Sequence, residues 1–235
     1  MNIVAEVLQG FGVVVAALLA LALVLALVVT LTPRLFVWVM HRTHVFDRRV
    51  LPPLRPQQVS TQVQVKTDVA YPSRYGNNTF DLYAPAAGGG AVLFWVHGGG
   101  FIGGDKSTIR PIALRLAAKG YTVVSLNYAL APKKHYPAAL VQLGEVYEHL
   151  RANAPRFGTP DLGRLAFGGD SAGAQIALQF VLLQTNPALA AAMYWHPQMP
   201  KEAIKANVLY CGPYDLAAFA NTGSRVLRFF VHQLG

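Results

Sequence analysis

The sequence is poor in charged residues, and acidic residues are the scarcest of them. Charged residues make up 13% of the 235 positions, whereas hydrophobic residues make up 53%. Lys and Arg together number 20 and Asp and Glu only 11, which gives a formal net charge of +9. This excess does not indicate nucleic-acid binding, because no basic stripe alternates with aromatic residues along the chain.

Cysteine is almost absent, since Cys211 is the only one in the sequence. A single cysteine excludes a disulfide within the chain, which fits a reducing compartment. Cys211 ends an apolar run, so we expect a buried packing residue and not a reactive thiol. We also find no Walker loop and no metal-ligand cluster, because His41 and His44 have no matching carboxylates nearby. We therefore expect no metal and no cofactor.

Charge is missing altogether from residues 7–31, and residues 11–29 are almost entirely Val, Ala and Leu. About 20 such residues, at roughly 1.5 Å each in a helix, match the hydrocarbon core of a bilayer. A cleaved signal peptide is the alternative. It would have a basic start and a shorter apolar run, whereas this segment carries Glu6 and no Lys or Arg before the run. We expect a single N-terminal membrane-spanning helix that binds the lipid bilayer.

Basic residues follow the apolar run. Five arginines lie just after it and are opposed only by Asp47: Arg34, Arg42, Arg48, Arg49 and Arg55. The positive-inside rule then places the following domain in the cytoplasm. We divide the chain into an anchor and juxtamembrane segment (residues 1–42), a Pro- and Arg-rich linker (43–58) and a third, folded domain (59–235).

Strand and helix patterns alternate through the third domain. Apolar runs and period-two alternation predict strands at 62–67, 79–83, 91–96, 121–126, 165–167 and 207–210. Helical spacing predicts helices near 109–117, 137–152, 172–183 and 224–234. This order is typical of an α/β fold with a mostly parallel sheet, helices on both faces and two antiparallel strands at its start.

The stretch GGDSAGAQ, which starts at Gly168, contains a G-x-S-x-G motif centred on Ser171. A predicted strand ends at Gly168 and a predicted helix starts after Ser171, which is the context of a nucleophile elbow. Gly169 and Gly173 allow neighbouring backbone to pack against that sharp turn. The N–H of Ala172, at the start of the helix, would then face a developing oxyanion.

A second motif, VHGGGFIGGD, follows the predicted strand 91–96. Consecutive glycines let backbone approach a ligand closely and present N–H groups to it. A loop at the carboxyl end of a central strand lies where α/β sheets bind ligands. The two motifs together therefore indicate a catalytic site, although either motif alone is also compatible with a plain glycine-rich loop or helix start.

HGGGFIGGDK, LNYALAPKKHYPAAL and GGDSAGAQ occur in this order, and the chain resembles the hormone-sensitive-lipase-like and feruloyl/acetyl-xylan-esterase-like α/β-hydrolases from about Val63 to Asp215. The resemblance implies that Ser171 is the nucleophile. It implies that Gly99 and Gly100 supply oxyanion N–H groups together with Ala172. His97 in such a motif supports the loop and is not the base; we count it among the supporting motif residues His97, Gly98, Gly169, Asp170 and Gly173.

The acid and base of a triad are not evident. In these enzymes both follow the serine, and the residues after Ser171 offer the acids Glu202 and Asp215 and the histidines His196 and His232. The one motif-like pair in the right order is Asp215 and His232, but Asp215 is not where the family places its acid, and His232 lies among apolar residues of a predicted helix. We therefore expect an α/β-hydrolase fold that lacks its last strands, incomplete at the C-terminus.

We expect a serine hydrolase of small carboxylic esters, with activity in doubt because of the missing triad partners. A non-catalytic, membrane-tethered binding module is the alternative, and a damaged gene product is the third possibility. A peptidase is less favoured, because HGGG loops resemble those of lipases and esterases. The sequence does not specify an oligomeric state.

Overall fold

The computed structural model describes residues 3–31, 38–39, 42, 62–221 and 228. The first helix, α1, runs Ile3–Leu31, and its side chains are described from Phe11 to Leu27. Over the described residues no helix is long and apolar enough to cross a membrane, so the expected spanning helix is not confirmed. The juxtamembrane arginines other than Arg42, the linker and the predicted helix 224–234 fall outside the described residues, apart from residue 228.

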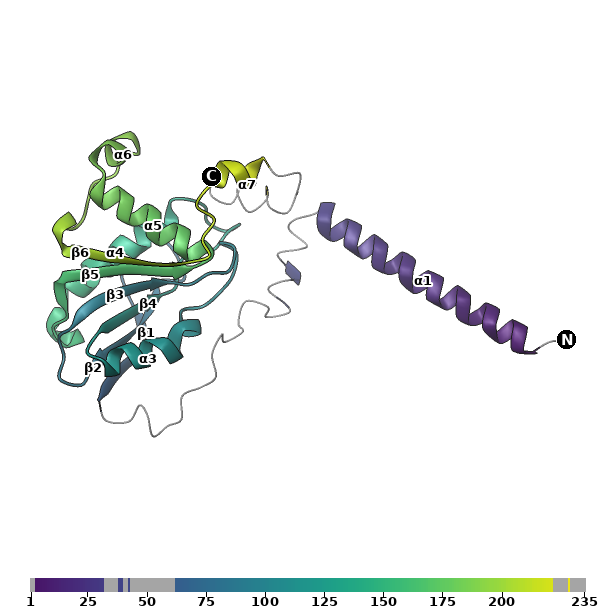
Figure 1. Cartoon of the computed structure of the whole chain (residues 1–235), viewed down its shortest axis with the longest axis horizontal. Helices are drawn as coiled ribbons and strands as arrows, with labels where there is room; N and C mark the ends of the chain where they lie inside the picture. Colours follow the sequence, from purple (N-terminus) through teal and green to yellow (C-terminus); the bar gives the residue numbers. More distant parts are fainter. Residues whose placement is uncertain (1–2, 32–37, 40–41, 43–61, 222–227, 229–235) are drawn as a thin grey trace.

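Six strands form one sheet in the order β1-β2-β4-β3-β5-β6 (Figure 1). The strands are β1 (Val63–Ala70), β2 (Thr79–Pro85), β3 (Ala91–Val96), β4 (Thr122–Leu126), β5 (Asp161–Asp170) and β6 (Ile204–Tyr210). β1 pairs antiparallel with β2, and β2 pairs antiparallel with β4. From β4 through β3 and β5 to β6 all pairs are parallel. The expected sheet, with two antiparallel strands at its start, is confirmed.

Helices cover both faces of the sheet (Figure 1). They are α3 (Arg110–Ala118), α4 (Ala138–Ala152), α5 (Ala172–Thr185), α6 (Pro187–Ala192) and α7 (Leu216–Ala220), with short 3-10 turns η3 (Lys106–Ile109), η4 (Ala154–Phe157) and η5 (Lys201–Ala203). Alternation along the strands assigns the faces: Phe94 packs in the core with α4 and α5, and its neighbour Trp95 packs in the core with α3.

The core beneath α5 is built on aromatic contacts. The ring of Phe167 in β5 stacks on Phe94 of β3, with centroids 5.1 Å apart, and meets Phe180 of α5 at 5.2 Å. All three side chains are fully buried. This packing fixes α5 on the sheet, and α5 begins directly after Ser171.

Several elements differ from the sequence prediction. β1 and β2 end later than predicted, β6 begins at Ile204, three residues earlier, and α6 and α7 are additional helices. β5 starts at Asp161, four residues before the predicted strand, where the N–H of Asp161 donates to the carbonyl of Gly90. The α5 helix ends before Pro187 as predicted. A further short helix, α6, begins there because Asn186 caps it: its Oδ1 accepts from the N–H of Leu189 at 3.1 Å.

Cys211 is also a correction, because it is exposed and not buried. It follows β6, which lies at the edge of the sheet in the described part of the chain, and most side chains of β6 are only partly buried or exposed. An apolar run at a sheet edge lacks the second neighbour that would enclose its end.

Phe167→Ala should lower the free energy of unfolding by about 3–5 kcal/mol, because it removes a fully buried ring and leaves a cavity between β3 and α5. The urea midpoint of the full chain measures this loss. Leu182→Ala, on α5 and 39% exposed, is the control and should shift the midpoint far less. Equal shifts for the two variants would contradict the assigned packing.

Candidate active site

Ser171 lies at a sharp turn between β5 and α5. Its backbone has φ 50° and ψ −118°, a left-handed region that costs a non-glycine residue of the order of 1–3 kcal/mol. A hydrogen bond from its N–H to the carbonyl of Tyr210 in β6, at 2.8 Å, holds the turn. The side chain is exposed, and its hydroxyl makes no hydrogen bond in the part of the chain that the structure describes. This strand–turn–helix geometry is the one expected for a nucleophile elbow.

The two glycines of the elbow are required by close backbone approach. A Cβ on Gly169 would lie 2.5 Å from the carbonyl oxygen of Val96, and a Cβ on Gly173 would contact the same oxygen more closely still. Backbone cannot yield to such contacts without moving the strands. The motif glycines therefore let β3 and α5 meet at the turn.

The glycine loop lies directly beside the elbow. β3 and β5 are parallel neighbours, with Val96 opposite Gly169, so the loop after β3 and the turn after β5 emerge at the same sheet edge. A Cβ on Gly98 would lie 2.8 Å from the carbonyl oxygen of Asp170 and would also meet the Asp170 carboxylate. The structure thus brings both motifs together.

The loop turns through a run of left-handed residues: Gly99 at φ 124°, Gly100 at φ 60° and Phe101 at φ 65°. The carbonyl of Gly99 accepts hydrogen bonds from Ile102 and Gly103, so the loop is folded on itself. Within the described residues the N–H groups of Gly99, Gly100 and Ala172 donate no hydrogen bond. N–H groups without a partner on the glycine loop and at the start of α5 are the kind of donor that an oxyanion hole uses.

His97 supports this loop from inside. It is fully buried, its Nδ1 lies 2.7 Å from the carbonyl oxygen of Gly98, and its ring stacks on Tyr128 with centroids 4.4 Å apart. The Tyr128 hydroxyl donates to the carbonyl of His97 at 3.0 Å. Burial lowers the pKa of His97, so the ring stays neutral. Enclosed in this way, His97 has no access to a substrate, which agrees with the supporting role expected from the motif.

Asp215 caps a helix in this structure. Its Oδ1 accepts from the N–H of Ala218 at 2.8 Å and so caps α7, the short helix that follows β6. The side chain is exposed. Its proposed partner, His232, lies outside the described residues, so this pair stays a prediction. The described residues also contain no group of three or more metal-ligating side chains.

Lys106, which ends the motif HGGGFIGGDK, has a structural role that the sequence alone did not indicate. Its ammonium lies 2.6 Å from Oδ1 of Asp68 and 3.0 Å from Oδ1 of Asp81. Lys106 and Asp81 are buried, whereas the Asp68 side chain is exposed. Asp68 lies at φ 54° within an irregularity of β1, and its N–H donates to Asp81 at 2.9 Å. One ammonium therefore joins the glycine motif to β1 and β2.

The backbone of Lys106 is tied to β4 as well. Its N–H donates to Oδ1 of Asn127 at 2.8 Å, and its carbonyl accepts from the hydroxyl of Ser125 at 2.7 Å. Asn127 in turn donates to Asp105, whose other oxygen caps η3 through Ser107. These bonds fix the C-terminal end of the glycine loop.

Hydrogen bonds in this cluster favour the ionised forms of Lys106 and Asp105. Burial alone lowers the pKa of Lys106, but hydrogen bonds to Asp68 and Asp81 outweigh it and raise the pKa above its ordinary value. Burial likewise raises the pKa of Asp105, while hydrogen bonds from Ser107 and Asn127 outweigh it and lower the pKa.

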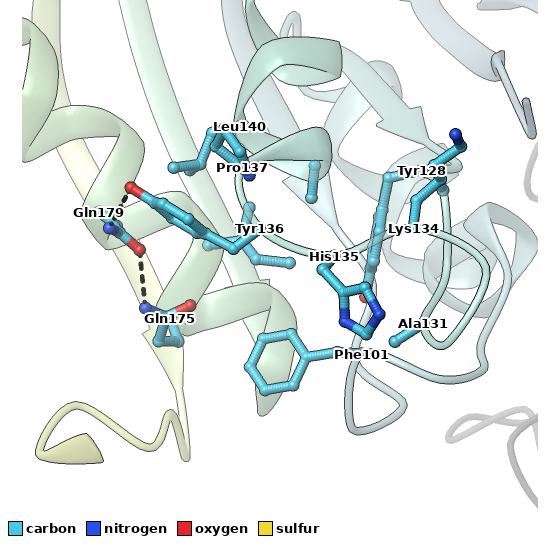
Figure 2. Close-up of a pocket in the computed structure, with 13 residues that line it drawn as sticks. Phe101, Tyr128, Ala131, Lys134, His135, Tyr136, Pro137, Leu140, Gln175 and Gln179 are labelled. Carbon is cyan, nitrogen blue, oxygen red and sulfur yellow. Dashed lines mark hydrogen bonds between the residues drawn. The ribbon is translucent and has the colours of Figure 1, made fainter. Parts of the chain in front are cut away.

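A hollow lies between the start of α4 and the first turns of α5, where Gln175 follows the elbow by one helical turn (Figure 2). Its walls come from the segment between β4 and α4, the first turns of α5 and Phe101 of the glycine loop. Gln175 and Gln179 line it from α5, and Tyr136 lines it from the opposite segment. Sequence analysis assigned no role to these three residues.

Lys106→Met should destabilise the fold by about 3–5 kcal/mol, because it leaves the buried carboxylate of Asp81 without its counter-charge. Urea unfolding of the full chain at pH 7 measures the effect. Arg151→Met removes an exposed ion pair with Glu148 on α4 and should change the midpoint little. A midpoint for Lys106→Met close to that control would refute a stabilising role for the cluster.

Comparisons with known proteins agree with this geometry. Acetyl esterases of Salmonella choleraesuis (strain SC-B67) and Salmonella schwarzengrund (strain CVM19633) are 37% identical to the chain over 153 and 115 residues, which cover 62% and 48% of this chain and 47% and 35% of theirs. The chain thus matches less than half the length of these curated relatives.

Among solved structures, esterase B of Lactobacillus rhamnosis superposes with a TM-score of 0.71 at 22% identity, covering 86% of this chain and 65% of its own. A bacterial heroin esterase gives a TM-score of 0.54 at 25% identity, covering 72% and 54%. The sequence model of the alpha/beta hydrolase fold matches residues 93–223, which include the glycine loop and the elbow. By this match, the chain belongs to the alpha/beta hydrolase family.

Proposed function

We propose that this protein hydrolyses carboxylic esters of small molecules, with Ser171 as the nucleophile. The observation that carries the proposal is the meeting of two motifs: an exposed serine at a strained turn, beside a glycine loop with unused N–H donors. The similarity to acetyl esterases supports an ester as the substrate class.

In the proposed reaction the Ser171 hydroxyl attacks the ester carbonyl. The N–H groups of Gly99, Gly100 and Ala172 hold the resulting oxyanion, the alcohol leaves, and water releases the acyl group from the serine. Donors fixed in place before the reaction need no reorganisation when charge develops, which is why such sites lower the barrier.

The proposal requires a base for Ser171. In serine hydrolases the loss of the histidine lowers turnover by a factor of the order of 10⁶, about 8 kcal/mol of barrier. Oxyanion donors and binding retain an acceleration of ~10³ over water. Asp215 and His232 are the ordered candidates for acid and base, and the cap that Asp215 forms on α7 would have to be exchanged for a contact with the histidine.

A second candidate function is a non-catalytic binding module on the same scaffold. It is favoured by one observation: the Ser171 hydroxyl has no hydrogen-bond partner in the described part of the chain. In that case the elbow and the glycine loop would bind a carbonyl or other acceptor without chemistry.

A fluorophosphonate probe separates these two functions. The full chain should be labelled, and Ser171→Ala should not be, because only an activated serine hydroxyl displaces fluoride. Ser73→Ala removes another hydroxyl outside the elbow and should keep the wild-type labelling rate. Absence of labelling in a chain with a normal unfolding midpoint would support the binding module and contradict the hydrolase.

We also propose that the N-terminal segment attaches the protein to a membrane, with the hydrolase domain on the cytoplasmic side. The charge-free run of residues 7–31 and the arginines after it support this. The full chain should stay in the membrane fraction after carbonate extraction, and a variant without residues 1–42 should be released. Recovery of the full chain in the soluble fraction would contradict attachment, and digestion of the domain by protease added outside intact cells would contradict the orientation.

A further inference from the structure

The hollow between α4 and α5 has apolar walls for most of its surface. Phe101, Tyr128, Ile176 and Leu140 line it together with three alanines. Lys134 and His135 reach its rim and are exposed, and no carboxylate lines it among the described residues. An apolar chain of a ligand would therefore fit the walls.

One polar strip crosses this apolar surface (Figure 2). Nε2 of Gln175 donates to Oε1 of Gln179 at 2.9 Å, and Nε2 of Gln179 donates to the hydroxyl of Tyr136 at 2.9 Å. The strip joins two turns of α5 to the segment before α4. In this arrangement Nε2 of Gln175 faces Gln179, so its Oε1 is left on the other side of the amide.

The strip ends in an unused acceptor. Oε1 of Gln175 accepts no hydrogen bond in the part of the chain that the structure describes, although only 8% of the residue is exposed. It is not among the unpaired polar atoms that are sealed off from solvent. Figure 2 shows this oxygen pointing away from Gln179, toward the space beside the Phe101 ring.

The acceptor lies one helical turn from the proposed nucleophile. The N–H of Gln175 donates to the carbonyl of Ser171 at 3.3 Å, and residues four apart lie on the same side of a helix. On the other side, Phe101 directly follows Gly100, and its carbonyl accepts from the N–H of Ala131 at 2.9 Å. A group attached to an ester at Ser171 thus has a short path into the hollow.

We propose that this hollow binds a hydroxyl-terminated arm of the ester, with Gln175 Oε1 accepting a hydrogen bond from that hydroxyl; the assignment to an ester rests on the proposed function. The arm is a short apolar chain that lies against Phe101 and Ile176 and ends in an O–H. A plain alkyl arm would leave the acceptor unpaired and shielded from water, which is unfavourable.

Other end groups fit less well. A carboxylate only accepts hydrogen bonds, so it would leave Oε1 of Gln175 without a donor and could use only the second hydrogen of Gln175 Nε2. An ammonium would donate to that oxygen but would find no counter-charge, because the rim carries Lys134 and His135. A hydroxyl donates to Gln175 Oε1 and keeps its lone pairs for the second hydrogen of Gln175 Nε2 or for water.

Two matched fluorophosphonates test the preference through the labelling rate of Ser171. They have arms of equal length, one ending in a methyl and the other in a hydroxyl, and the hydroxyl is placed in turn on the acyl-like and on the alcohol-like arm. In one of these positions the hydroxyl probe should label the full chain about three- to tenfold faster, the range expected for one net hydrogen bond.

Gln175→Met should abolish this ratio, because it keeps the length of the side chain and removes the acceptor. Gln184→Met is the control on the same helix: Gln184 is buried and bonded to the N–H of Gln198, away from the hollow. It should keep the ratio even if it lowers stability. A ratio near one in the wild-type chain, or an unchanged ratio in Gln175→Met, overturns the proposal.

If neither probe labels the chain, the proposed hydrolase activity is contradicted, but ligand binding by the hollow is not yet tested. A binding measurement then tests it. Butane-1,4-diol should shift the side-chain amide NMR signals of Gln175 in the full chain, and Gln175→Met identifies these signals by their loss. Butan-1-ol at the same concentration should shift them less than half as far. Equal shifts from both, or none from the diol, would also overturn the proposal.

Discussion

The approach of β3 and β5 at their carboxyl ends is the constraint on which the site depends. The carbonyl oxygen of Val96 lies so close to the turn after β5 that a Cβ fits at neither Gly169 nor Gly173. A larger residue at either position would push the elbow away from the glycine loop. Because the sheet fixes the register of these strands, the distance between serine and donors is set by backbone pairing and not by side chains.

Rigid surroundings on two sides hold the strained backbone of the site in place. Ser171, Gly99, Gly100 and Phe101 all have positive φ within one small region. At one end the hydrogen bond from Ser171 to β6 and the aromatic packing under α5 hold the turn. At the other end the cluster around Lys106 holds the loop. Strained backbone persists only where its neighbours determine it more strongly than its own preferences.

Local sequence predicted the elements that are defined by their own residues. β3 has the predicted bounds, because its continuous apolar run is bounded by a glycine tract on one side and a glycine loop on the other. The elbow and the glycine loop were predicted by motif and lie where expected. The first residues of β5 were not predicted as strand, because this part contains the charged residues Asp161 and Arg164. It is strand only because Asp161 pairs with Ala91 of the neighbouring strand β3. Propensity carries no information about such a partner.

The features that sequence analysis missed share one cause. Lys106 bonds to an aspartate 38 positions away, and Gln179 bonds to a tyrosine 43 positions away. Each residue by itself resembles an ordinary surface side chain, and its meaning appears only when the fold places its partner beside it. The predicted burial of Cys211 was wrong for a related reason, because an apolar run predicts burial only where a neighbouring strand covers it.

In this fold the contacts that position the elbow are separate from those that would hold a catalytic base. Ser171 is held by its backbone hydrogen bond to Tyr210 and by packing beneath α5, and no side chain of the described residues contributes to its position by contact with its hydroxyl. The geometry of Ser171 and of the N–H groups beside it therefore does not depend on a histidine being present. The proposed binding of a carbonyl group, and of an arm in the hollow, would persist whether or not a base activates the serine. A variant can consequently lose turnover and keep ligand binding, or the reverse. Binding and turnover therefore have to be measured separately.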